Sequence, residues 1–252
     1  MSYTIMATSK TPALVVYLLD ISASMDKRLG KKSRLETAMD ALNAAIRTMV
    51  FRSSKGRRIQ PRYRLAIYAY SNEVFDLLGG IRTIDEVAQT KLPEIDTRRG
   101  TDTAKAFMAA GELIGHELAN MQEHPAPLVC HLTDDRYTGR DPKPIVNAIM
   151  QMSNGDGSVL VENIYISDKL GNDPNKDALK WPGIQRGTQL NDEYGRELIE
   201  MSSHLPTSYH IIMEEMGSKI KTDSVMMFPG NTPDLISLGF QMSSATGVGR
   251  QT

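Results

Sequence analysis

A short apolar run near the N-terminus constrains the fold more than any other feature of the sequence. Residues 13–19 (ALVVYLL) are almost continuously apolar and include β-branched side chains. A strand without alternation of polar and apolar residues is buried on both faces, which is typical of a parallel sheet covered by helices. The chain is therefore expected to build a layered α/β fold around this strand.

Helical and strand patterns alternate along the rest of the chain, which favours βαβ units and a doubly wound, mostly parallel sheet flanked by helices. Ser33 and Glu36 form a capping-box pattern at the start of the first helix. Residues 168–192 predict a long polar loop, in which Trp181 either pins the loop to the core, the favoured alternative, or marks a contact surface. Helices are expected over 33–51, 83–88, 101–117, 142–152, 193–203, 207–216 and 235–241, and further strands over 63–71, 74–78, 127–133 and 159–167.

Length and charge are those of an ordinary globular protein. The 252 residues are expected to form a single domain, 1–252, with a core of about 10–170 and a C-terminal extension of about 171–252. A formal net charge of -1 argues against a general nucleic-acid or membrane binder. The basic residues of 55–64 are either a solvated loop, the favoured alternative, or a docking surface for an acidic or nucleic-acid partner.

Cysteine usage and the N-terminal residues bear on the compartment. The only cysteine, Cys130, lies in an apolar run and predicts a buried thiol, which favours a reducing compartment. The first residues lack the basic and apolar pattern of a signal peptide, and no run reaches the roughly 18 apolar residues of a membrane span. A cytoplasmic protein is expected. His131, in a strand pattern, predicts a buried histidine with satisfied hydrogen bonds.

Polar side chains follow two of the predicted parallel strands and open one predicted helix. In an open parallel sheet, ligands bind at the carboxyl ends of the strands. Alternate side chains of an extended segment point the same way, so Asp20, Ser22 and Ser24, which follow the first strand, can converge on one point. Two carboxylates and three hydroxyls form a hard oxygen site suited to Mg²⁺ or Mn²⁺, with Ca²⁺ as a further alternative. The expected ligands are Asp20, Ser22, Ser24, Thr101 and Asp134.

Three sequences carry a family resemblance: Asp20-Ile21-Ser22-Ala23-Ser24, Gly100-Thr101-Asp102-Thr103 and Leu132-Thr133-Asp134. Together, and in this order, they resemble the metal-ion-dependent adhesion site of von Willebrand factor A domains, over roughly residues 10–170. The resemblance implies a Rossmann-like fold in which Ser22, Ser24 and Thr101 contact the metal, while the two aspartates bond directly or through water. In the family a glycine usually follows the aspartate of the third sequence. This chain has Asp135 at that position, which adds a negative charge near the predicted ion.

The function implied is metal-dependent protein binding without catalysis. A hydroxyl-rich metal site stays electrophilic, so an acidic residue of a partner protein is the expected additional ligand. The resemblance is to the intracellular, bacterial members, which work beside kinases, phosphatases or AAA+ ATPases in stress modules. The alternative is an enzyme of phosphoryl-transfer or hydrolytic type that uses the same Mg²⁺ as a Lewis acid.

Overall fold

The computed structural model describes residues 3–167, 178–215 and 217–245, and its centre is a seven-stranded sheet. The strand order is β13-β10-β9-β1-β6-β7, and β8 also pairs with β6. The first five strands in this order are parallel, whereas β7 and β8 run antiparallel to β6. The bounds are β1 Ala13–Asp20, β6 Tyr63–Tyr70, β7 Val74–Asp76, β8 Arg82–Thr83, β9 Leu128–Thr133, β10 Leu160–Tyr165 and β13 Met227–Pro229.

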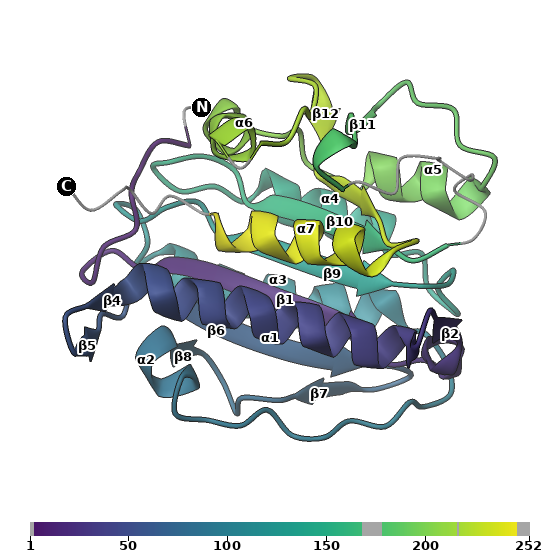
Figure 1. The fold of residues 1–252 in the computed structure, drawn as a ribbon, viewed down its shortest axis with the longest axis horizontal. Helices are drawn as coiled ribbons and strands as arrows, with labels where there is room; N and C mark the ends of the chain where they lie inside the picture. Colours follow the sequence, from purple (N-terminus) through teal and green to yellow (C-terminus); the bar gives the residue numbers. More distant parts are fainter. Residues whose placement is uncertain (1–2, 168–177, 216, 246–252) are drawn as a thin grey trace.

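Helices cover both faces of the sheet, so the predicted doubly wound, mostly parallel architecture is confirmed. α1 and α7 lie side by side over one face, and α3 and α4 lie behind the other (Figure 1). The α1 capping box is present: Ser33 accepts a hydrogen bond from the backbone of Glu36 and donates its own backbone N–H to the Glu36 carboxylate. The bounds are α1 Arg34–Ser53, α2 Ile84–Val87, α3 Thr103–Leu118, α4 Lys143–Gln151, α5 Glu193–Glu200, α6 Thr207–Glu215 and α7 Pro233–Ser244.

The chain beyond residue 170 contributes to the central layers. β13 pairs in parallel with β10, and α7 packs against α1, β10 and β13. The sequence patterns did not predict β13. Within the predicted 168–192 loop, residues 168–177 lie outside the described part, and the remainder contains the 3-10 helix η2 (Ala178–Lys180) and β11 (Ile184–Gln185), which pairs with β12 (Ser224–Val225).

Two side chains behave as their sequence contexts predict. Trp181 is 5% exposed and packs against the Phe228 ring, with 5.0 Å between ring centroids and an interplanar angle of 42°, so it pins its segment to the core. His131 is fully buried; its ring nitrogens lie 2.7 Å from the Tyr70 hydroxyl and 2.7 Å from the amide oxygen of Asn163. Since that oxygen only accepts, Nδ1 carries the proton and Nε2 accepts from Tyr70. Burial lowers the pKa of His131 to about 4.

One acidic side chain is enclosed between the sheet and its helical cover. Glu162 on β10 lies opposite Cys130 on β9, which in turn lies opposite Tyr17 on β1, and all three are fully buried. Tyr17 shares a hydrogen bond of 2.7 Å with Ser243 of α7. Burial raises the pKa of Glu162 well above its usual range, and the Cys130 thiol offsets only part of this effect.

Glu162 should therefore make stability fall as pH rises. Above the ordinary value of 4.5 the unfolded chain releases this proton, while the folded protein retains it. The free energy of unfolding then decreases by up to about 1.4 kcal/mol per pH unit. We expect Glu162→Gln to remove this contribution, as measured by urea unfolding of parent and variant between pH 5 and 8. Parallel pH profiles for the two proteins would contradict it.

Candidate metal centre

The candidate site lies where two parallel neighbours, β1 and β9, end. Asp20 is the last residue of β1, and Asp134 directly follows β9, with Leu19 and Leu132 opposite each other in the register. The chain leaves β1 for β6 on one side and reaches β9 on the other, so this is the topological switch point of the sheet. The predicted carboxyl-edge location of both aspartates is therefore the one found.

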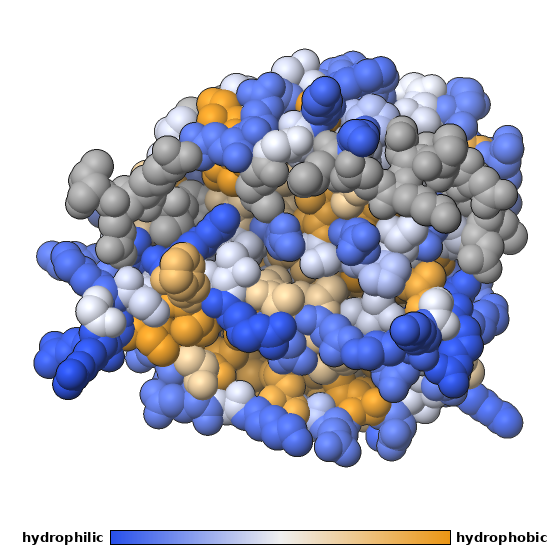
Figure 2. Space-filling view, viewed as in Figure 1, coloured by the Kyte–Doolittle hydropathy of each residue, from blue (hydrophilic) through white to orange (hydrophobic). Residues whose placement is uncertain are grey.

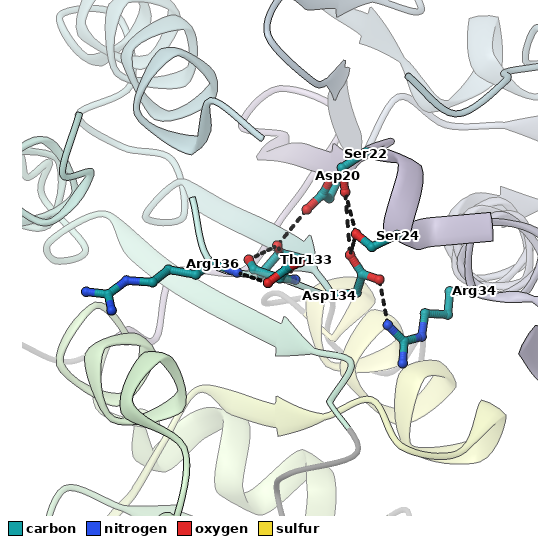
Figure 3. Close-up of polar contacts among 8 residues, drawn as sticks. Asp20, Ser22, Ser24, Arg34, Thr133, Asp134 and Arg136 are labelled. Atoms are coloured by element: carbon teal, nitrogen blue, oxygen red, sulfur yellow. Dashed lines mark hydrogen bonds and ion pairs between the residues drawn. The ribbon is translucent and has the colours of Figure 1, made fainter. Parts of the chain in front are cut away.

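Three oxygen atoms gather at this edge (Figure 3). The hydroxyls of Ser22 and Ser24 are 2.9 Å apart, and Ser24 donates to Oδ1 of Asp134 at 2.6 Å. The distance from the Ser22 hydroxyl to the same Oδ1 is 3.5 Å. Neighbouring ligands of an octahedral Mg²⁺ bound at about 2.1 Å lie about 3.0 Å apart. The triangle formed by these oxygens therefore fits one face of such a coordination shell.

Asp20 lies behind this triangle and organises it. Its Oδ1 accepts a hydrogen bond from the backbone N–H of Ser22 at 2.7 Å, and its Oδ2 accepts from the Thr133 hydroxyl at 2.7 Å. Burial raises the pKa of Asp20 to about 7, against the lowering effect of these hydrogen bonds. The sequence motif assigns no role to Thr133, and the structure gives it one: its hydroxyl holds the Asp20 carboxylate.

Arg34 is a member of the site that the sequence patterns did not predict. It is the first residue of α1, its side chain is 6% exposed, and its Nη1 lies 2.6 Å from Oδ2 of Asp134. A positive charge in the first turn of a helix opposes the helix dipole. That conflict was visible in the sequence, since Arg34 follows the predicted N-cap Ser33, and it indicates that the cation has a nearby carboxylate.

Thr101 reaches the same edge through backbone contacts. Its N–H donates to the Thr138 hydroxyl at 3.1 Å, and its C=O accepts from the backbone of Thr138 at 2.8 Å, in the loop after β9. Gly100 makes the preceding turn with φ +85, and a Cβ there would lie 1.8 Å from the side chain of Asn72. Among the described hydrogen bonds, none joins the Thr101 hydroxyl to the serine and aspartate network.

Asp135, the residue that departs from the family, is exposed. Its Oδ1 accepts a hydrogen bond of 2.8 Å from the backbone N–H of Arg136, which follows it. The Arg136 guanidinium in turn pairs with Glu193 at 3.1 Å and Glu197 at 2.6 Å, on α5. The Asp135 carboxylate is thus held by its own loop, separately from the Ser22, Ser24 and Asp134 triangle.

The donor set decides which metals suit the site. Within the described residues, no three His, Cys, Asp or Glu side chains form a group that could hold an ion. A cation at this edge would be held by Ser22, Ser24 and Asp134, with hydroxyls in the majority, and such ligands favour Mg²⁺, Mn²⁺ or Ca²⁺ over thiophilic metals. The donors present fit a hard divalent cation.

Comparison with known proteins agrees with this architecture. Residues 15–136 match the sequence model of the von Willebrand factor type A domain, a range that contains all five predicted ligands. A search of curated proteins gives no match. Within the described residues, no helix combines the length and apolar character that crossing a membrane requires.

Solved structures show the same fold at low sequence identity. The VWA domain of SpRpn10 aligns with a TM-score of 0.53 and 13% identity over 96% of this chain and 100% of that domain. Proximal thread matrix protein 1 from the mussel byssus, in a structure with a zinc-occupied MIDAS motif, aligns with a TM-score of 0.51 and 12% identity. The alignment covers 93% of this chain and 47% of that protein's chain. The pilus adhesin SpaC from Lactobacillus rhamnosus GG aligns with a TM-score of 0.58 and 8% identity. The alignment covers 93% of this chain and 30% of SpaC. The fold is the Rossmann-like von Willebrand factor A fold.

The Arg34–Asp134 pair makes a prediction about stability and metal binding together. Arg34→Gln leaves a buried carboxylate without its cation, so we expect the free energy of unfolding without metal to fall by about 3–5 kcal/mol. Added Mg²⁺ should stabilise the variant more than the parent, because the dication meets a less compensated carboxylate. Thermal unfolding with and without Mg²⁺ measures both effects.

Two variants control this experiment. Arg34→Lys keeps the charge and should retain most of the stability. Arg64→Gln breaks the pair between Arg64 and Glu117, at 2.7 Å, whose side chains are 25% and 26% exposed. It should cost about 1 kcal/mol or less without altering the Mg²⁺ effect. An equal Mg²⁺ effect in parent and Arg34→Gln would contradict the prediction.

Proposed function

We propose that this chain is a protein-binding module that holds a divalent cation, Mg²⁺ in the first instance, and uses it to capture an acidic side chain of a partner protein. The observation that carries the proposal is the triangle of oxygens from Ser22, Ser24 and Asp134 at the switch point of the sheet. Thr101, at the same edge, is the further proposed ligand. Asp20 positions the first loop through the Ser22 backbone.

The charges of the site favour an anionic ligand. Asp20 and Asp134 supply two negative charges, while Arg34 supplies one positive charge that is buried against Asp134. With a dication present, the formal sum is one positive charge. A carboxylate from outside neutralises it, and the bound metal supplies an electrophilic point of attachment for that carboxylate. Asp135 weakens this preference little, because its carboxylate is exposed and bound to its own loop.

Similar proteins support binding over catalysis. The three structures compared above are named as a VWA domain, a thread matrix protein and a pilus adhesin, and none of the three is named as an enzyme. Transferred to this chain, that likeness favours an interaction module. No observation on the described site favours the phosphoryl-transfer or hydrolytic alternative.

Removing the two serine hydroxyls should weaken metal binding without altering the charge of the site. The variant Ser22→Ala with Ser24→Ala removes two of the three oxygens and keeps the Arg34–Asp134 pair, so its fold should survive. We expect Mg²⁺ affinity, measured by titration calorimetry, to fall at least about tenfold, since two ligands are lost. The matched control is Ser54→Ala at the far end of α1, where the hydroxyl donates only to the Val50 carbonyl at 2.8 Å. Unchanged Mg²⁺ affinity in the double variant would refute the ligand assignment.

Carboxylate capture can be tested with a peptide array before a partner is known. Each peptide carries one Glu and is matched by a copy with Gln at the same place. We expect binding to Glu peptides in Mg²⁺, weaker binding to their Gln copies, and loss of the difference with EDTA or in the double serine variant. Equal binding to both copies, or binding indifferent to EDTA, would show that the site does not act through a partner carboxylate.

A further inference from the structure

A long stretch of the chain carries positive charge only. Between Asp40 and Glu73 the sequence contains no acidic residue, although the whole protein has a formal net charge of -1. The stretch covers the second half of α1, the hairpin of β4 (Ser54–Lys55) and β5 (Arg58–Ile59), and β6. Its basic residues are Arg47, Arg52, Lys55, Arg57, Arg58, Arg62 and Arg64.

Four of these cations have neither an ion pair nor a side-chain hydrogen bond in the described structure. Arg52 donates to the Ser244 carbonyl, Arg62 to the Gln60 side chain, and Arg64 pairs with Glu117. In the part of the chain that the structure describes, the other four are exposed and make no ion pair or hydrogen bond through their side chains. These four are Arg47, Lys55, Arg57 and Arg58.

The hairpin places like charges together at a cost. Gly56, with φ +61, begins the turn, and Lys55 lies directly opposite Arg58 in a ladder of only two residue pairs. Like charges at directly opposed positions destabilise a strand pair. The local structure is therefore weaker than a neutral hairpin would be, which favours a binding explanation for the charges over a purely structural one.

An aromatic ring stands beside these charges. Phe51, in the last turn of α1, is 80% exposed, and Arg47 lies one helical turn before it on the same face. The neighbouring apolar residues Val50 and Ile59 are partly buried against the core, so of these three side chains Phe51 is the one that projects. Figure 2 shows hydrophilic side chains extending from the end of the molecule where α1 meets β4 and β5, with apolar surface beside them.

We propose that Phe51, Arg47 and the β4–β5 hairpin form a binding surface for single-stranded nucleic acid. Guanidinium groups bind phosphates in a bidentate manner, and three of the four uncompensated cations are arginines. An exposed aromatic ring stacks on bases of any sequence, and cations beside it follow the backbone. A lipid surface would be met by several projecting apolar side chains, and an acidic peptide would leave the Phe51 ring without a partner.

Binding of a fluorescein-labelled 20-nucleotide oligo(U) or oligo(dT), followed by fluorescence anisotropy, tests the proposal. With four phosphate contacts, the logarithm of the affinity should fall against the logarithm of salt concentration with a slope of about -3. Phe51→Ala should weaken binding about 5- to 150-fold with the slope unchanged, because one stacked base is lost. Arg57→Gln with Arg58→Gln should reduce the magnitude of the slope by about 1.4, because each lost phosphate contact accounts for about 0.7.

Controls use exposed residues outside the surface. Ile211→Ala, at a side chain 52% exposed on α6, matches Phe51→Ala, and Lys91→Gln matches the charge variants; neither should change oligonucleotide affinity. EDTA should have no effect, which separates this surface from the proposed metal site. No oligonucleotide binding at 50 mM salt overturns the proposal. The proposal is also overturned if the protein binds phosphatidylserine vesicles or polyglutamate more tightly than the oligonucleotide and this binding depends on Phe51.

Discussion

The carboxylate of Asp134 fixes the arrangement of the carboxyl edge of the sheet. One of its oxygens accepts from Ser24 and the other pairs with Arg34, so the loop after β1, the start of α1 and the end of β9 meet at one side chain. A buried ion pair adds little stability compared with apolar packing, yet losing one partner is costly. The pair is therefore better explained by the arrangement of the three segments that it joins than by the stability it contributes.

Much of the fold could be predicted because its signals are local. The apolar runs at β1 and β9 predict strands buried on both faces, and the Ser33–Glu36 capping box predicts where α1 begins. The candidate site followed from topology: parallel strands place the residues after their carboxyl ends together, so Asp20 and Asp134 could be paired although 114 positions separate them in the numbering.

The remainder depends on contacts distant in sequence. β13 has only three residues and ends in a proline, so no periodicity could reveal it; its parallel pairing with β10 makes it a strand. Arg34 belongs to the site only because Asp134 lies beside it in space, and Thr133 only because its hydroxyl faces Asp20. Patterns of residue type predicted the proposed ligands, but not the side chains that hold those ligands.

α1 links the two ends of the molecule described above. Its first residue is Arg34, at the candidate metal centre, and its last turn carries Phe51, beside the basic hairpin (Figure 1). Twenty residues at the rise of an α-helix span about 30 Å. The helix is thus a rigid spacer: a carboxylate held at one end and a nucleic-acid strand held at the other would be separated by about this distance. A ternary complex would keep the two ligands a fixed distance apart.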